Sequence, residues 1–272
     1  MALGCNVEIL SIGNELLLGN TVNTNASWIA SRVTTLGGNV TRITTVADNL
    51  EEISQALREA IRRRPAFIIT TGGIGPTFDD MTMHGVAKGL RVRLRLDRAA
   101  VMMIREHYAR GFPKSHIELT KPRLKMARLP FGAVAIRNPI GTAPGARLNV
   151  RGIGIFCLPG VPREAKAIFR ETISSSIGAR ARGSMYFDKW VRVQGVMESV
   201  LAPLVDRTMR RWAGVYVKSH PRGVEAGGRP MIELHFSARA RNQKNAERVV
   251  LGAVKSLLRE LREHGAQIGP VR

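Results

Sequence analysis

Three glycines and two aspartates lie close together in the segment 70–82, TTGGIGPTFDDMT. Gly72, Gly73 and Gly75 allow the backbone to approach a ligand closely and to turn several N–H groups toward an anion. Asp79 and Asp80 follow, and two carboxylates beside a bound phosphate favour a divalent cation such as Mg²⁺, held jointly by aspartate and phosphate oxygens. A helix cap would explain one of these aspartates but not both. The segment has neither the Gly-Lys-Ser/Thr ending of a P-loop nor a GxGxxG pattern.

Three further segments carry residues suited to a phosphorylated ligand. Glu15, in SIGNE after the first predicted strand, could accept from a ligand hydroxyl or help to hold a metal; alternatively, it stabilises the first turn of a helix. The segment 138–145, NPIGTAPG, contains more glycine, proline and side-chain donors than a plain β-turn requires. The segment 158–164, LPGVPRE, ends a strand and opens a helix, which leaves N–H groups for an anion. Arg163 in it is either a phosphate clamp or a solvated surface residue.

The elements that would position these segments alternate between strand and helix. Apolar runs predict strands, and amphipathic runs that end at glycine or proline predict helices. Asp48 and Glu51 form a predicted capping box for the helix that ends before Pro65, and Asp97 caps a later helix. The predicted strands are 7–12, 40–46, 66–70, 133–137, 147–150 and 152–158, and the predicted helices are 24–36, 48–64, 80–90, 98–110 and one from 161 onward. This order predicts a doubly wound, mostly parallel α/β sheet, which binds ligands beyond the carboxyl ends of its strands.

A small, polar segment at 178–184 predicts a linker between two domains. Residues 1–177 would form the α/β domain and residues 185–272 a smaller α+β domain with β-α-β-β-α order. Its predicted strands are 190–196, 215–219 and 231–238, and its predicted helices are 198–211 and 245–264. The glycine-rich residues 223–230 are interpreted as the loop of a hairpin and not as a phosphate loop.

Charge and cysteine content restrict the class of protein. The chain of 272 residues has 42 Lys and Arg against 21 Asp and Glu, a formal net charge of +21, which favours anionic partners such as nucleotides, pterin phosphates or nucleic acid. The alternative is an arginine-rich surface that reflects a GC-rich or thermophilic genome. No apolar run is long enough to span a membrane, and the N-terminus lacks signal-peptide features, so a cytoplasmic location is expected. Cys5 and Cys157 lie far apart, which argues against a zinc site; reduced thiols fit best, with a disulfide as the other option.

Four motifs in a fixed order resemble a known family. SIGNELLLG…TN at 11–25, GGIGPTFDDMT at 72–82, NPIGTAPG at 138–145 and LPGVPRE at 158–164 are similar to the signature of the molybdopterin-binding (MoaB/Mog-like) domain. The closest branch is the N-terminal domain of the competence/damage-inducible protein CinA and its archaeal stand-alone relatives. VMES at 196–199 and KSHP at 218–221 resemble the small KH-like second domain of that branch. The deamidase domain of full-length CinA is absent from the sequence, so nicotinamide-mononucleotide deamidase activity is not expected.

The resemblance and the residue chemistry together give a predicted site. The acidic positions held important in Mog-type enzymes match Asp48 and Asp80, and with Glu15 these are the predicted catalytic residues. The predicted metal ligands are Asp79 and Asp80. The predicted ligand-binding residues are Thr71, Gly72, Gly73, Gly75, Thr77, Asn138, Gly141, Thr142, Pro159, Gly160 and Arg163, and the family pattern adds Thr82. The sequence departs from that pattern at His84, where relatives usually carry an acid, and more mildly at Ser11, where they commonly carry Thr.

The resemblance implies three candidate functions. The first is metal-dependent cleavage of a phosphoanhydride, as in an ADP-ribose pyrophosphatase, with a divalent metal such as Mg²⁺. The second is binding or adenylylation of molybdopterin, with molybdopterin or an adenine nucleotide as the ligand. The third is nucleic-acid binding by the C-terminal domain, through Arg207, Arg210 and Arg211; the absence of a GxxG clamp argues against it. The C-terminal domain is instead expected to serve as a lid or dimerisation element, in a homo-oligomer that does not contact a membrane.

Overall fold

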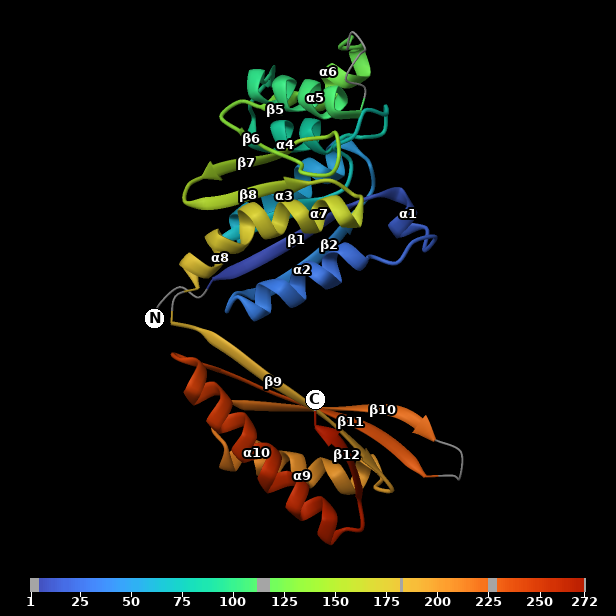
Figure 1. Cartoon of the computed structure of the whole chain (residues 1–272), viewed down its shortest axis with the longest axis vertical. Coiled ribbons are helices and arrows are strands. Elements are labelled where there is room, and N and C mark those ends of the chain that lie inside the picture. Colours follow the sequence, from blue (N-terminus) through green and yellow to red (C-terminus); the bar gives the residue numbers. More distant parts are fainter. Residues whose placement is uncertain (1–4, 112–117, 182, 225–228, 272) are drawn as a thin grey trace. The chain divides into compact units, whose positions relative to one another are not determined.

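The structure is a computed structural model that describes residues 5–111, 118–181, 183–224 and 229–271 (Figure 1). The chain divides into two compact units, Met1–Ala181 and Arg182–Arg272. Helix α8 (Ser174–Arg180) occupies the first residues of the predicted linker at 178–184, and position 182 of that linker lies outside the described residues. The helix continues because Ile177 is fully buried and anchors its last turns.

A six-stranded sheet in the order β2-β1-β3-β8-β7-β6 forms the centre of the first unit. Strands β2, β1, β3 and β8 run parallel to one another, and β7 is antiparallel to both of its neighbours. The predicted mostly parallel sheet is therefore confirmed. The strands are β1 (Asn6–Ile12), β2 (Asn39–Val46), β3 (Phe67–Thr71), β6 (Val134–Ile136), β7 (Gly145–Val150) and β8 (Ile153–Leu158).

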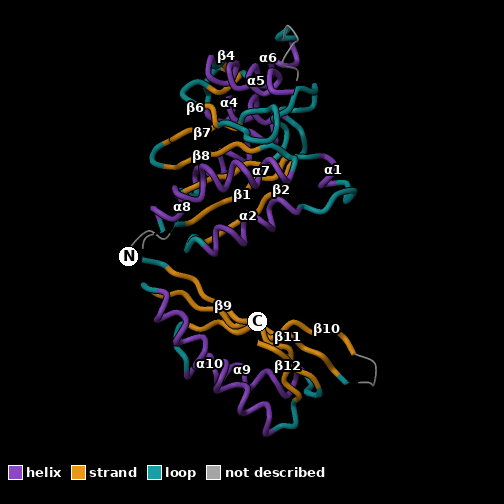
Figure 2. Tube along the Cα trace, in the orientation of Figure 1, coloured by secondary structure: helices purple, strands orange, loops and turns teal. Residues whose placement is uncertain are grey.

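Helices cover both faces of this sheet, as Figures 1 and 2 show. Alternate residues of β1 enter two different cores: Val7 and Ile9 pack with α2 and α7, whereas Leu10 and Ile12 pack with α3 and α4. A strand that is buried on both faces needs such a continuous apolar run, which explains the pattern of β1 and β3. The helices are α1 (Asn14–Leu17), α2 (Thr24–Thr35), α3 (Leu50–Arg62), α4 (Thr82–Leu90), α5 (Arg98–Gly111), α7 (Pro162–Ile168) and the π-helical segment η1 (Phe169–Ile173), which leads into α8.

The stretch between α4 and β6 contains short elements that the sequence pattern did not predict. Strands β4 (Leu94–Leu96) and β5 (Arg128–Pro130) form a two-stranded antiparallel sheet, and α6 (Lys121–Met126) precedes β5. The predicted cap of α5 is confirmed, because Asp97 Oδ1 accepts a hydrogen bond of 2.8 Å from the Ala100 N–H.

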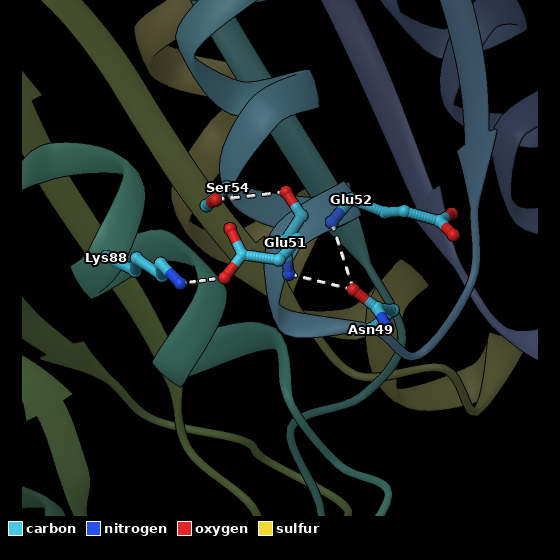
Figure 3. Close-up of polar contacts among 5 residues, drawn as sticks. All are labelled: Asn49, Glu51, Glu52, Ser54 and Lys88. Carbon is cyan, nitrogen blue, oxygen red and sulfur yellow. Dashed lines mark hydrogen bonds and ion pairs between the residues drawn. The ribbon is translucent and has the colours of Figure 1, made fainter.

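The cap of α3 is Asn49 and not Asp48, which corrects the predicted capping box (Figure 3). Asn49 Oδ1 accepts hydrogen bonds from the N–H groups of Glu51 and Glu52, at 2.8 and 3.2 Å. Glu52 accepts a hydrogen bond of 3.2 Å from the Ala47 N–H, two residues before the cap, and not from the cap residue itself as a capping box requires. Lys88 of α4 pairs with Glu51, which ties the start of α3 to its neighbour. Asp48 therefore does not cap α3, and its carboxylate accepts from the Asn14 N–H instead.

Asp79 and Asp80 lie in a turn before α4 and not in its first turn, which corrects the predicted start at residue 80. Helix α4 begins at Thr82. The Thr82 hydroxyl donates to the Gly72 carbonyl at 2.6 Å, and its N–H donates to the Gly73 carbonyl at 2.9 Å. These two bonds fix the helix start against the end of β3.

The second unit is a four-stranded antiparallel sheet in the order β10-β11-β9-β12, with α9 and α10 packed against it. The predicted β-α-β-β-α order is found, but β12 adds a sixth element, and the resulting β-α-β-β-α-β arrangement is that of the ferredoxin-like fold. Gly269 and Pro270 interrupt the alternation of β12, so the pattern did not reveal it. The elements are β9 (Met185–Gln194), α9 (Glu198–Arg211), β10 (Val215–Val224), β11 (Pro230–Ala240), α10 (Gln243–Glu263) and β12 (Gln267–Val271).

The structure bears on two further expectations, the state of the two cysteines and the presence of a membrane-spanning helix. No disulfide joins Cys5 and Cys157, which are both buried. Complete burial raises the pKa of the Cys157 thiol to about 11, so this thiol is protonated at neutral pH. Among the helices of the described residues, none has the length and apolarity that a membrane crossing requires.

Replacing Asn49 with Ala should lower the free energy of unfolding by about 1 kcal/mol, because two N–H groups of α3 lose their acceptor. Asn49→Asp keeps an acceptor at the same position. Its free energy of unfolding should stay within roughly a few tenths of a kcal/mol of the wild-type value. Urea titration of the three proteins measures the difference. Equal midpoints for wild type and Asn49→Ala would show that Asn49 does not cap α3.

Candidate functional site

Five connecting segments meet at the carboxyl edge of the first sheet. β1, β2, β3 and β8 run parallel, and β6 has the same direction because β7 is antiparallel to both β6 and β8. The predicted segments after β1, β3 and β8 and the connection between β6 and β7 therefore lie at one edge. A short turn after β2, which carries Asp48, joins them there.

The glycine turn, residues 72–75, has a backbone that only glycine fits at its first position. Gly72 has φ of 101°, and a Cβ there would lie 2.1 Å from the Ile12 carbonyl oxygen. The Gly72 N–H donates to the Leu158 carbonyl at 3.1 Å, so the turn is held between the ends of β1 and β8. The N–H groups of Gly73, Ile74 and Gly75 donate to no other described residue. These groups can therefore donate to an anion.

The site cavity, a hollow of about 440 Å³, lies beside the glycine turn. Its volume lies in the range of small-molecule sites. Asp80 and Glu164 are the charged residues of its lining, which contains no Lys or Arg among the described residues. The lining consists of Gly73, Ile74, Gly75, Pro76, Asp80, Tyr108, Met126, Thr142, Ala143, Pro159, Gly160, Val161 and Glu164.

Glu164 is fixed in the wall of the site cavity by Asn138. The Asn138 amide donates to Glu164 Oε2 at 2.7 Å and to the Ala143 carbonyl at 3.0 Å. The Asn138 oxygen accepts from the Gly141 N–H at 2.8 Å, so this buried side chain is satisfied at both ends. A Cβ at Gly141 would lie 2.2 Å from the Glu164 carboxylate, which explains the glycine there. Oε1 of Glu164 has no bonding partner among the described residues.

The acidic turn, residues 77–80, is held closed by its own hydrogen bonds. Asp80 Oδ2 accepts from the Thr77 N–H at 2.8 Å, and the Thr77 hydroxyl lies 2.6 Å from the same oxygen. Lys125 donates to the Thr77 carbonyl and approaches both aspartates. Hydrogen bonding from Thr77 lowers the pKa of Asp79, and burial lowers the pKa of the Lys125 ammonium against the opposing effect of both aspartates. The turn thus has one cation against two carboxylates.

Asp48 faces the same region from the end of β2. Its Oδ2 accepts from the Asn14 N–H at 2.8 Å, and Asn14 Oδ1 accepts in turn from the Asp48 N–H at 3.3 Å. A Cβ on Gly73 would lie 3.4 Å from Asp48 Oδ1, so this oxygen borders the glycine turn. Burial raises the pKa of Asp48, and the nearby carboxylates of Glu15, Asp79 and Asp80 raise it further. Such an environment is typical of a functional carboxylate.

The carboxylates fit a divalent cation only as part of a larger ligand set. Among the described residues there is no group of three or more His, Cys, Asp or Glu side chains that could hold a metal by themselves. Mg²⁺ is commonly bound by one or two carboxylates together with substrate phosphates and waters. Asp48 Oδ1 and Asp80 Oδ1 are the oxygens that remain for this purpose, because Oδ2 of each accepts a backbone N–H.

His84, at the position where an acid was expected from the resemblance, lies in α4 close to the charges of Lys125 and Arg128. Burial lowers the pKa of its imidazole, and the charges of Lys125 and Arg128 lower it further, so the neutral form predominates at pH 7. Its buried Nδ1 has no hydrogen-bond partner among the described residues.

The structure brings some of the predicted site residues into the cavity lining and leaves others outside. Gly73, Gly75, Asp80, Thr142, Pro159 and Gly160 line the site cavity. Asn138, Gly141, Thr77, Asp79, Gly72 and Asp48 support that lining from behind or beside it. Thr71 is buried in β3, and Thr82 is buried at the start of α4. Glu15 and Arg163 are exposed outside the lining.

Sequence reasoning missed several residues of the cavity wall. Glu164 belongs to the fourth motif, and its charge beside a glycine loop was a usable signal. Tyr108 and Met126 come from α5 and α6, whose helical patterns gave no indication of which face borders a ligand. The Arg123 guanidinium covers one face of the Tyr108 ring, 3.8 Å from its centroid. Asn25, which donates to the Gly160 carbonyl at 2.7 Å, has a buried Oδ1 with no partner among the described residues.

Comparison with known proteins gives relatives for each part of the chain. A protein of Metallosphaera sedula is 45% identical over 258 residues, which cover 93% of this chain and 94% of that protein. A protein of Sulfurisphaera tokodaii is 41% identical over 262 residues, 96% of this chain and 95% of that protein. The crystal structure of the protein CinA from Thermoplasma acidophilum, whose function is described as unknown, is 41% identical with a TM-score of 0.59. It covers 64% of this chain and 98% of its own.

Residues 8–179 match the family model described as "Probable molybdopterin binding domain". The matched range contains all five segments of the carboxyl edge and every residue that lines the site cavity. The chain therefore belongs to this molybdopterin-binding domain family and, with CinA among its relatives, is a CinA-like member of it.

Proposed function

We propose that the site cavity binds a phosphorylated pterin of the molybdopterin type, and that Asp48 and Asp80 act on a phosphoanhydride bond beside it. The observation that carries the proposal is the Glu164 carboxylate, held in the cavity wall by Asn138 at 2.7 Å. The proposal agrees with the family to which the chain belongs.

Glu164 favours a pterin over an adenine ring. A pterin presents an amino group and a ring N–H side by side, and both donate, so a carboxylate can accept from the two together. Adenine presents its amino group next to ring acceptors, which a carboxylate would repel. The rings of Tyr108 and Pro159 and the thioether of Met126 supply an apolar wall for the flat heterocycle.

The glycine turn supplies the phosphate end of the proposed site. Three N–H groups, those of Gly73, Ile74 and Gly75, are available to a phosphate. The cavity lining contains two carboxylates and no cationic side chain, so a bare diphosphate would enter it against the local charge. A divalent cation that arrives with the phosphate would remove this repulsion and polarise the phosphoanhydride.

Asp48 and Asp80 would hold such a cation and orient the attacking oxygen. Two reactions need these same parts. In the first, a pterin phosphate oxygen attacks the α-phosphate of ATP, which transfers the adenylyl group and releases pyrophosphate; in the second, water attacks ADP-ribose, which yields AMP and ribose 5-phosphate. The raised pKa of Asp48 reflects its burial and the three neighbouring carboxylates, and a cation shared with Asp80 would relieve the repulsion among them. The hydrolysis of ADP-ribose is the second candidate function. The observations that favour it are the positions of Asp48 and Asp80, and it does not require a role for Glu164.

Glu164→Gln should weaken pterin binding at least tenfold, because the amide presents a donor where the carboxylate accepts. Its oxygen can still accept from Asn138, so the wall should keep its shape. Glu171→Gln removes the same charge from an exposed position on the same helical segment and should leave affinity unchanged. Calorimetric titration with molybdopterin or a stable phosphorylated pterin gives the comparison. Equal affinity of wild type and Glu164→Gln would contradict the proposed orientation of the ring.

Asp48→Asn and Asp80→Asn should each lower turnover by at least about a hundredfold, because each removes a carboxylate that acts on the reacting phosphate. AMP release from ADP-ribose with Mg²⁺ or Mn²⁺ tests hydrolysis, and adenylyl transfer from ATP to the pterin tests the other reaction. Asp206→Asn, an exposed substitution on α9, is the matched control. Unchanged rates in both aspartate variants would remove these residues from the catalytic assignment.

A further inference from the structure

A second hollow, of about 610 Å³, lies at the amino-terminal edge of the first sheet, opposite the site cavity. It is formed where β1, β3 and β8 begin, and Asn6, Ala66 and Ile153 belong to its lining. Ligands of open α/β sheets bind at the carboxyl edge, so the fold alone does not account for a cavity here. None of its lining residues is shared with the site cavity.

Four arginines surround this second hollow: Arg62, Arg64, Arg151 and Arg180. We call it the arginine hollow. Among the described residues, its lining contains no Asp or Glu. None of the four guanidinium groups has an ion pair or a side-chain hydrogen bond with another described residue. The acid nearest in sequence to β1's start, Glu8, is already bound by the neighbouring Arg63 through two hydrogen bonds of 2.8 Å.

The helix ends at the arginine hollow offset only part of this charge. Arg62 is the last residue of α3, and Arg180 is the last residue of α8. The carboxyl end of a helix has about half a negative charge, so two such ends together offset about one of the four positive charges. About three positive charges therefore remain in the hollow without a counter-charge from the surrounding residues. Their mutual repulsion is unfavourable unless an anion binds between them.

The backbone at two of these arginines is of the kind that favours glycine. Arg64 and Arg151 both have φ of 52°. A side chain in this left-handed region costs free energy, so glycine fits the backbone at both positions without strain. Arg91, with φ of 57° at the end of α4, has the same backbone but does not line the arginine hollow.

We propose that the arginine hollow binds a compact polyphosphate, such as the phosphate chain of a nucleoside triphosphate. Guanidinium groups form paired, charge-assisted hydrogen bonds with phosphate oxygens, and four of them can surround a chain of two or three phosphates. The apolar lining at Ile61, Pro65 and Ile153 provides contact for a non-phosphate part of the ligand. The volume suits a small molecule of nucleotide size. This site is independent of the proposed function, because it shares no residue with the site cavity.

The test uses inorganic tripolyphosphate as the probe, in the presence of EDTA so that no metal mediates binding. Wild-type protein should bind it, and Arg64→Gly and Arg151→Gly should each weaken binding about tenfold, which corresponds to 1.4 kcal/mol. Glycine suits the left-handed backbone at both positions, so neither variant should lower the melting temperature. Arg91→Gly has the same change of charge and backbone outside the hollow, and its affinity should stay within about twofold of the wild type. Arg62→Gln and Arg180→Gln, at exposed helix ends, should also weaken tripolyphosphate binding. They remove a charge from the hollow without changing a residue in the left-handed conformation.

Three results would overturn the proposal. Wild-type protein that does not bind tripolyphosphate at millimolar concentration would show that the hollow is not a polyphosphate site. An equal loss in Arg91→Gly would show that binding follows net charge alone. Loss of binding in Glu164→Gln or Asp80→Asn, with the arginine variants unchanged, would place the probe in the site cavity. Retention of tripolyphosphate binding in those two variants supports a separate site, whether or not the pterin proposal holds.

Discussion

A Cβ atom on Gly72 would lie 2.1 Å from the carbonyl oxygen of Ile12, and this steric limit determines how β3 can end. Because the backbone there is left-handed and pressed against β1, the chain turns at once into Gly73, whose carbonyl accepts from the N–H of Thr82. The start of α4, the acidic turn before it and the N–H groups that face the cavity all follow from that turn. Any side chain at Gly72 would separate β1 from β3 at the edge where the ligand site is formed.

The positive charge of the chain does not extend to the described lining of the site cavity, although Lys125 and Arg123 lie behind it, next to Asp80 and Tyr108. The chain has a formal net charge of +21, yet Asp80 and Glu164 are the charged residues of the cavity lining, and Asp48 stands beside it. A positive molecule attracts anions over distances of about the Debye length, roughly 8–10 Å at physiological salt. Under the proposed function, the local carboxylates would select among these anions, because a phosphate would have to come with a cation or reach the N–H groups of the glycine turn. General attraction and local selection would then depend on different residues.

The sequence predicted the elements of both units well where one signal was strong. β1 and β3 are continuous apolar runs buried on both faces, and α2 and α9 are bounded by clear caps or amphipathic patterns. Asp48 was mistaken for the cap of α3 because Asp and Asn cap equally well, and only the backbone conformation decides between adjacent residues. β12 was missed because Gly and Pro interrupt it and its partner β9 lies far away in the sequence. The motifs located the site, but the role of Glu164 depends on a contact with Asn138 across 26 residues.

The environment of Asp48 shows how function and stability oppose each other at this edge. Its pKa is raised in the folded protein by burial and by three neighbouring carboxylates. A group with a raised pKa binds its proton more tightly when folded, so its effect on stability is most favourable at low pH. This contribution is lost as pH rises from the ordinary pKa of an aspartate through the raised pKa of the folded protein, and above that range the ionised carboxylate is unfavourable. Asparagine could accept the same N–H from Asn14 without this cost. A carboxylate kept where a neutral amide would avoid this cost agrees with the proposed use of its charge beside the glycine turn, which Asp48 borders.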